Sequence, residues 1–130
     1  MREKRELLKA YIKANVAPIL VDFITGEDLE EAIILPSNIS QDELNGYYDD
    51  TTYRPPKWLD EIISRNKPSI LVIDNIDSID KEEQEKFIEI LKYKKVSTFN
   101  IPKTTIVIVT AKVINKDKIN EKIYSLVAQI

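Results

Sequence analysis

The fold of this 130-residue chain is decided by the stretch Ser69-Ile70-Leu71-Val72-Ile73-Asp74-Asn75-Ile76-Asp77. Its β-branched, apolar centre is typical of a strand that is buried on both faces, and such strands belong to parallel sheets. The apolar run ends on Asp74, where the chain leaves the sheet. Ligands of open parallel α/β sheets bind at this end of the strands. The sequence therefore places a candidate site beside Asp74.

Half of a nucleotide site is recognisable around Asp74. In nucleoside triphosphatases a carboxylate at this point of a strand, the Walker B position, orients Mg²⁺. Such enzymes also need a glycine-rich phosphate loop with lysine and serine or threonine. The chain has only two glycines, Gly26 and Gly46, and neither opens such a loop. Asp74 is thus a candidate metal ligand, and the alternative is a carboxylate that bonds only to its own neighbours.

Composition limits the function classes. Hydrophobic residues make up 43% and charged residues 32%, which is typical of one globular domain, here residues 1–130. A net charge of -3 gives no indication of nucleic-acid binding. The absence of cysteine and histidine excludes disulfides, thiolate zinc sites and catalytic triads. No apolar run is long enough for a bilayer and no signal-peptide core is present, so we expect a cytoplasmic protein without membrane contact.

Helix and strand patterns alternate along the chain, which predicts an α/β domain with a parallel sheet. The expected helices cover residues 2–15, 27–34, 57–65, a segment from Asp80 to about Lys95, and 117–124. The expected strands cover residues 17–24, 69–74, 104–110 and an edge strand at 126–130. Asp80 and Glu83 have the spacing of a capping box. Residues 37–56 are rich in turn formers and predict a long loop.

The ordered series of these segments resembles the core of AAA+ ATPases, and most of all the MoxR-type branch. The resemblance is carried, in chain order, by Val21 to Pro36, Leu44 to Tyr47, Pro68 to Asp77, Ile90 to Lys92, Val96 to Pro102, Ile106 to Thr110 and Ile119 to Leu126. It implies a three-layer, P-loop-NTPase-like fold with a small parallel sheet. It also implies a role in ring-type remodelling machinery.

The chain departs from that family at several points. The family's first strand and Walker A phosphate loop should precede the helix at residues 2–15, so we expect both to be lacking, together with the C-terminal lid. Asn75 stands where the family has its catalytic glutamate, and an amide cannot accept a proton from water. Thr110 and Lys112 lie near the sensor-1 position. No arginine follows Arg65 to act as a finger.

These departures predict a truncated or degenerate ATPase core that is inactive alone and acts within a larger assembly. Protein partners or self-association are expected. The chain alone should bind no cofactor, and ATP with Mg²⁺ should bind only if a phosphate loop is supplied elsewhere. The alternative is a non-catalytic protein-interaction module on the same P-loop-NTPase-like fold.

Two further hypotheses remain open from the residues alone. Asp74 and Asp77, together with Asp22, are candidates for the metal-binding carboxylates of a nuclease or Toprim-like site. Four aromatic residues near Arg54 are candidates for a base-stacking surface, or for packing onto the core. They are Tyr47, Tyr48, Tyr53 and Trp58.

The family likeness also predicts the order of the strands. The strands that end at residues 22–24, 74 and 110 should run parallel, with the Asp74 strand between the other two. In a complete AAA+ core the phosphate-loop strand lies beside the sensor-1 strand, on the side away from Asp74. Since we expect that strand to be lacking, residues 126–130 should cover the exposed edge, and their deletion should cause aggregation.

Overall fold

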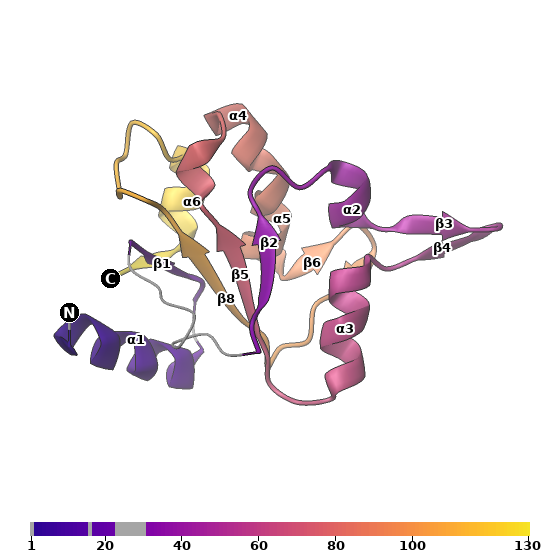
Figure 1. The fold of residues 1–130 in the computed structure, drawn as a ribbon, viewed down its shortest axis with the longest axis horizontal. Coiled ribbons are helices and arrows are strands. Elements are labelled where there is room, and N and C mark those ends of the chain that lie inside the picture. Colours follow the sequence, from indigo (N-terminus) through magenta and orange to yellow (C-terminus); the bar gives the residue numbers. More distant parts are fainter. Residues whose placement is uncertain (1, 16, 23–30) are drawn as a thin grey trace.

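The computed structural model describes residues 2–15, 17–22 and 31–130 of the chain. Its centre is a five-stranded sheet in the order β2-β5-β8-β1-β9, in which all neighbouring strands are parallel (Figure 1). These strands are β1 (Ile19–Val21), β2 (Ile33–Pro36), β5 (Ile70–Asp74), β8 (Ile106–Thr110) and β9 (Ala128–Gln129). Two antiparallel hairpins lie outside this sheet: β3 (Tyr47–Asp49) with β4 (Thr52–Arg54), and β6 (Lys95–Val96) with β7 (Phe99–Asn100).

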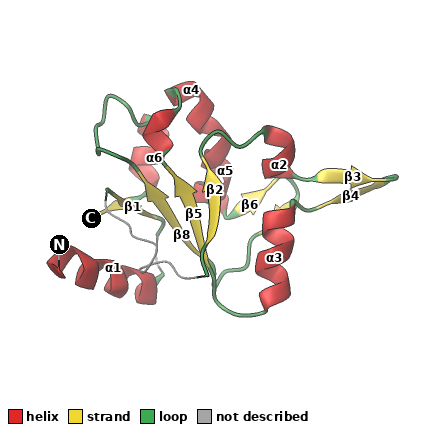
Figure 2. Ribbon diagram, viewed as in Figure 1, coloured by secondary structure: helices red, strands yellow, loops and turns green. Residues whose placement is uncertain are grey.

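Helices cover both faces of the sheet (Figure 2). They are α1 (Arg2–Ala14), α2 (Gln41–Asn45), α3 (Lys57–Arg65), α4 (Lys81–Gln84), α5 (Ile88–Tyr93) and α6 (Glu121–Leu126), with 3-10 turns at Ile76–Ser78 and Glu85–Phe87. Leu8 of α1 is buried against one face, and helices α3, α5 and α6 are buried against the other. The three-layer α/β arrangement predicted from the sequence is confirmed. Within the described ranges, no helix is long and apolar enough to cross a bilayer.

The pairing of β5 with β8 forms the middle of the core. Its register runs from Ile70 opposite Ile106 to Ile73 opposite Val109. Along β5, Leu71 and Ile73 contribute to one hydrophobic cluster and Val72 to the other, and all three are at most 1% exposed. Burial on both faces is what the apolar, β-branched run predicted.

The predicted position of the Asp74 strand within the sheet is wrong. The strands that end near Asp22, Asp74 and Thr110 do run parallel, but β8 lies between the other two. β1 pairs with β8 from Ile19 opposite Ile108 to Val21 opposite Thr110. β1 therefore occupies the side of β8 that we expected residues 126–130 to cover.

The C-terminal segment covers a different edge from the one predicted. Because β5 and β1 take both edges of β8, the segment pairs with β1 instead. The Ala128 N–H donates to the Pro18 carbonyl at 2.8 Å, and the Ile130 N–H donates to the Leu20 carbonyl at 3.0 Å. The segment is a strand of the sheet, as expected, but it is separated from β8 by β1.

The predicted helix at residues 27–34 is wrong at its described end, while residues 27–30 lie outside the described ranges. Ile33 and Ile34 belong to β2, which pairs with β5 from Ile33 opposite Leu71 to Pro36 opposite Asp74. Adjacent isoleucines favour a strand once a neighbouring strand offers a free edge. The local pattern alone did not distinguish the two structures.

The predicted loop at residues 37–56 contains helix α2 and the hairpin β3–β4, which projects from the body of the domain (Figure 1). Gly46 joins the helix to the hairpin with φ 129. A Cβ atom at this position would lie 2.5 Å from the Arg54 carbonyl oxygen. Glycine is therefore required here both by the backbone conformation and by the close approach.

Two helix starts also differ from the prediction. The Asp80 side chain makes no capping hydrogen bond, and Glu83 forms an ion pair with Lys86 at 3.5 Å, so the capping box is absent. The last helix begins at Glu121 rather than at residue 117. Its cap is Asn120, whose side chain accepts a hydrogen bond from the Lys122 N–H at 2.9 Å.

A buried glutamine connects α4 to the start of α6. Gln84 is fully buried. Its Nε2 donates to the carbonyl oxygens of Ile79 at 3.1 Å and Lys118 at 2.8 Å. Its Oε1 accepts from the Asn120 N–H at 2.8 Å. One side chain thus satisfies three backbone groups from two separate segments.

Replacing Gln84 by leucine should lower the free energy of unfolding by about 2–4 kcal/mol, because it leaves buried backbone groups without partners. Urea denaturation followed by tryptophan fluorescence measures this change. The matched control is Gln41→Leu at an exposed position, which should stay within about 0.5 kcal/mol of the wild type. An equal loss in the two variants would contradict the role of Gln84.

Candidate functional site

The predicted site residues lie at the edge of the sheet where the parallel strands end. Asp74 ends β5, Thr110 ends β8, and Ser37 directly follows β2. The β5–β8 register places Ile73 opposite Val109, so the next residues, Asp74 and Thr110, are neighbours. Asp22 follows β1 on the far side of β8.

The Thr110 hydroxyl links Asp74 to Asn75. Thr110 Oγ1 donates to Asp74 Oδ1 at 2.8 Å and accepts from the Asn75 N–H at 2.9 Å. The Asn75 side-chain Nδ2 lies 3.4 Å from Asp74 Oδ2. Thr110 is only 7% exposed and Asp74 is half-buried. Both carboxylate oxygens of Asp74 therefore have hydrogen-bond partners within the chain itself.

Asn75 makes the turn that follows β5. Its backbone is in the left-handed region with φ 53, which asparagine adopts more readily than most residues. The Asn75 carbonyl accepts from Ser78 Oγ at 2.8 Å, and Ser78 Oγ lies 2.7 Å from Ser37 Oγ. This chain of hydrogen bonds joins the ends of β2, β5 and β8. The serines were not singled out by the sequence analysis, because only the fold brings them together.

The Asp77 carboxylate binds backbone groups. Its Oδ1 accepts from the Lys112 N–H at 3.1 Å, and its Oδ2 accepts from the Val113 N–H at 3.3 Å. Asp77 thus fixes the chain that leaves β8. No sequence pattern indicated this role, because the two amides are far away along the chain.

The three carboxylates proposed for a nuclease-like metal site do not come together. Asp77 is used by backbone amides, and the exposed Asp22 forms an ion pair with Lys4 at 3.8 Å. Across the part of the chain that the structure describes, no three acidic side chains form a group that could hold a metal ion. The described residues therefore do not assemble a multi-carboxylate phosphoryl-transfer site.

A hollow of about 470 Å³ lies beside this edge, between the Asn75–Ser78 segment and residues 112–118. Asn75, Lys112 and Lys118 line it, and all three are exposed. Amide and ammonium groups can bind a polar or anionic group, but neither an amide nor a charged lysine accepts a proton from water. The carboxylate among the lining residues is that of Asp77, and both its oxygens accept backbone N–H groups.

The four aromatic residues that were candidates for a base-stacking surface do not lie together on the surface. They are Tyr47, Tyr48, Tyr53 and Trp58. The Tyr53 ring lies 4.9 Å from that of Tyr48 and 5.4 Å from that of Phe99, centroid to centroid. Trp58 is 8% exposed, and its Nε1 donates to the Leu44 carbonyl at 3.1 Å. Packing into the core therefore explains Trp58, while the half-buried Tyr53 packs against Tyr48 and Phe99. Tyr47 and Tyr48 remain exposed on the projecting hairpin.

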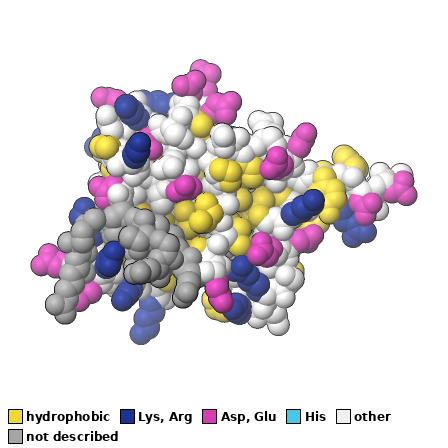
Figure 3. Space-filling model, in the orientation of Figure 1, with side chains coloured by type: hydrophobic (Ala, Val, Ile, Leu, Met, Phe, Trp, Pro, Cys, Tyr) yellow, Lys and Arg dark blue, Asp and Glu magenta, His cyan; other side chains and the backbone are white. Residues whose placement is uncertain are grey.

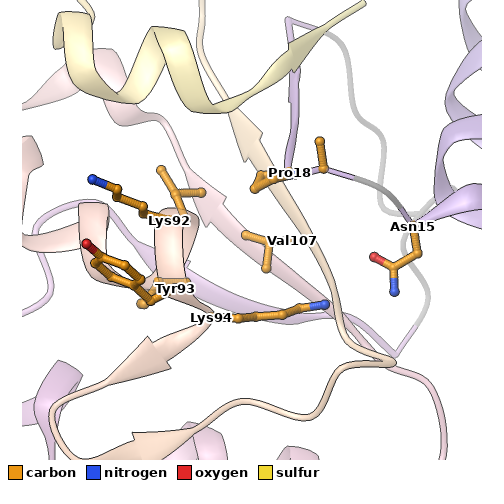
Figure 4. A pocket seen from close by; sticks show the side chains of 9 residues that line it. Asn15, Pro18, Lys92, Tyr93, Lys94 and Val107 are labelled. Carbon is orange, nitrogen blue, oxygen red and sulfur yellow. The ribbon is translucent and has the colours of Figure 1, made fainter.

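A smaller cavity of about 220 Å³ lies near the start of β1, where the Lys94 side chain extends below Val107 toward Asn15 (Figure 4). Lys94 Nζ donates to the Lys103 carbonyl at 2.8 Å, and Asn15 Nδ2 donates to the same oxygen at 3.0 Å. Burial lowers the pKa of Lys94, and no carboxylate in the described ranges pairs with it. These bonds connect the ends of α1 and α5 to the segment before β8, which is a structural role.

The fold is similar to that of solved proteins, although no protein-family model and no curated protein sequence matches the chain. One structure of NtrX from Brucella abortus in complex with ADP matches with a TM-score of 0.64 at 13% identity. The match covers 99% of this chain and 34% of that one. A second NtrX structure from Brucella abortus matches with a TM-score of 0.56 at 15% identity, over 96% and 35% of the two chains.

This chain spans about a third of the length of those two proteins. At such low identity the likeness shows the fold alone. The fold is α/β with a parallel sheet between helices, as the sequence predicted, and it resembles part of these two structures. The fifth strand of the sheet, β2, was not predicted.

Replacing Thr110 by valine should lower the free energy of unfolding by about 1–3 kcal/mol, because Asp74 and the Asn75 N–H both lose their partner. Thr110→Ser keeps the hydroxyl and should recover most of this loss. The matched control is Thr104→Val, at an exposed position just before β8. Urea denaturation measures all three variants, and a neutral Thr110→Val would show that the hydroxyl link contributes nothing.

Proposed function

We propose that this domain is an ATPase-like core of AAA+ ancestry that does not hydrolyse ATP by itself and binds other proteins within a larger assembly. The observation that carries the proposal is the engagement of the Asp74 carboxylate by Thr110 and Asn75. Asp74 stands at the Walker B position of the family likeness. These hydrogen bonds occupy two of the roughly four acceptor positions of the carboxylate and compete with a metal ion for its oxygens.

The residues after β1 support the same conclusion. β1 lies beside β8, on the side away from Asp74, and the family likeness puts the phosphate-loop strand there. Residues 22–31, which follow β1, read Asp-Phe-Ile-Thr-Gly-Glu-Asp-Leu-Glu-Glu, with five acidic residues, one glycine and no lysine or arginine. Phosphate groups are bound by backbone amides and cations and repelled by carboxylates. The residues present therefore do not fit MgATP.

The hydrolytic step also lacks its usual proton acceptor. Asn75 stands where the likeness puts a catalytic glutamate, and its amide cannot act as a general base. No arginine follows Arg65. ATP and Mg²⁺ would bind only with a phosphate loop supplied from outside these residues. We place the domain nearest the MoxR-type branch, because the motifs follow in that branch's order.

A second candidate is a protein-interaction module that has no connection with nucleotide at all. Exposed hydrophobic side chains near β2 and the projecting hairpin favour it. Ile34 is 57% exposed, Tyr48 is 73% exposed and Tyr47 is 40% exposed. The two candidates differ in whether a partner with an intact phosphate loop restores ATP turnover when it is mixed with this chain.

Calorimetric titration with MgATP should show no binding tighter than about 1 mM, because the sequence has no glycine-rich loop with a lysine to hold the phosphates. A phosphate-release assay should give only background turnover. The matched control is Asp74→Ala, which should give the same heats as the wild type. Asn75→Glu should add no turnover, because a base alone does not position the nucleotide. Micromolar affinity in the wild type that is lost in Asp74→Ala would contradict the proposal.

A further inference from the structure

An apolar groove of about 610 Å³ lies between β2, α2 and the start of α3. Ile34, Ile39 and Trp58 are among the residues that line it, and Tyr47 lies at the side of the hairpin. Figure 3 shows hydrophobic side chains gathered over this part of the surface, with charged side chains around them. Exposed hydrophobic patches that are bordered by polar residues commonly mark protein-binding sites.

The groove runs beside an edge of the sheet. Among the residues that the structure describes, β2 pairs with β5 alone, so its second edge has no strand partner. The free N–H and C=O groups of such an edge can pair with an added strand. The edge is short and ends at Pro36, which has no N–H to donate. It can therefore accept only a few residues of an extended segment.

Acidic side chains border the groove. Asp42 and Glu43 line it and are exposed, and no cation within the described ranges forms an ion pair with either. Lys57 is the one basic residue among the described lining residues. A neighbouring hollow shares Ile39 with the groove, and it is lined by three glutamates and one lysine: Glu82, Glu83, Glu85 and Lys86.

These charges favour a basic partner segment over a second copy of this chain as the occupant of the groove. In the neighbouring hollow Glu83 pairs with Lys86 and Glu85 with Lys122. A segment that fills the groove still meets the carboxylates of Asp42 and Glu43, which favour lysine or arginine next to its apolar residues. Pairing between the β2 edges of two copies of this chain would bring Asp42 and Glu43 of each copy near the same acidic border. Like charges that face each other oppose that pairing.

We propose that the β2 edge and its groove bind an extended segment of a partner protein, with apolar residues flanked by lysine or arginine. The inference rests on the proposed function, because it names the surface and the partner chemistry of the protein-binding role. Main-chain pairing with β2 supplies affinity, and the groove and its acidic border supply specificity.

Trp58 provides a direct probe of this groove, because it lines the groove and is the only tryptophan of the chain. The ligand for the test is the synthetic peptide Lys-Val-Ile-Val-Lys-Lys with blocked ends, titrated without nucleotide. We expect a saturable change in tryptophan fluorescence, together with shifts of the Ile33–Leu35 amide signals in NMR spectra. Added salt should weaken the binding. The control peptide has glutamate in place of each lysine and should not bind.

Two surface variants test the location. Ile34→Lys puts a charge at the β2 edge and should weaken peptide binding by about tenfold or more. Ile63→Lys is the matched control, since Ile63 is 50% exposed on α3 and does not line the groove. Its affinity should equal that of the wild type. Circular dichroism and urea denaturation confirm that both variants fold.

The proposal is overturned if the peptide at about 1 mM leaves both signals unchanged, if Ile34→Lys binds as well as the wild type, or if the glutamate peptide binds equally. It is also overturned if sedimentation shows a wild-type dimer that Ile34→Lys disperses, since the occupant is then a second copy. None of these results changes the MgATP titration, so failure of this inference is distinguishable from failure of the proposed function.

Discussion

The end of the sheet that carries the candidate site depends on the two hydrogen bonds of the Thr110 hydroxyl. Parallel pairing of β5 with β8 places Thr110 beside Asp74, and the hydroxyl then bonds to Asp74 and to the Asn75 N–H. The turn at Asn75 sets the direction of the chain toward Ser78 and Asp77, which in turn hold the ends of β2 and β8. Several polar groups at the edge where ligands of parallel sheets normally bind are therefore bonded to one another within the chain.

The lateral edges of the sheet, formed by its two outermost strands, differ from this end. β9 pairs with β1, and β5 and β1 take both edges of β8, so each of the central strands β5, β8 and β1 has a strand neighbour on both edges. Among the described residues β2 has one open edge, and it lies beside an apolar groove with an acidic border. One protein with a similar fold is known in complex with ADP. In this chain the surface that we propose for binding is instead the lateral groove beside β2, and the proposed ligand is a protein segment. The protein-binding role that we propose follows from this contrast.

Much of the core could be predicted from the sequence, because its signals are local. The apolar runs of β5 and β8 and the amphipathic pattern of α3 each identify their own element. β2 could not be identified, since an apolar run of four residues becomes a strand only beside the free edge of β5. The predicted strand order was wrong for a related reason. No local pattern records that β1 pairs with β8 rather than with β5.

The same limit applies to the site. Asp74 was recognised from its place at a strand end, whereas Asn75 and Thr110 were singled out through the resemblance to AAA+ ATPases. Their hydrogen bonds join residues about 35 positions apart in the chain and could not be read from spacing. Ser37 and the buried Gln84 were missed for this reason, since each has its partners on distant segments.

The central proposal is that the Asp74 carboxylate serves the structure of the domain and does not bind metal. A double-mutant cycle with Asp74→Ala and Thr110→Val, measured as unfolding free energy with and without MgCl₂, tests it most directly. The account predicts a coupling energy of about 1–3 kcal/mol between the two residues that Mg²⁺ leaves unchanged. A coupling energy near zero, or stabilisation of the wild type by Mg²⁺ that is absent in Asp74→Ala, would contradict it.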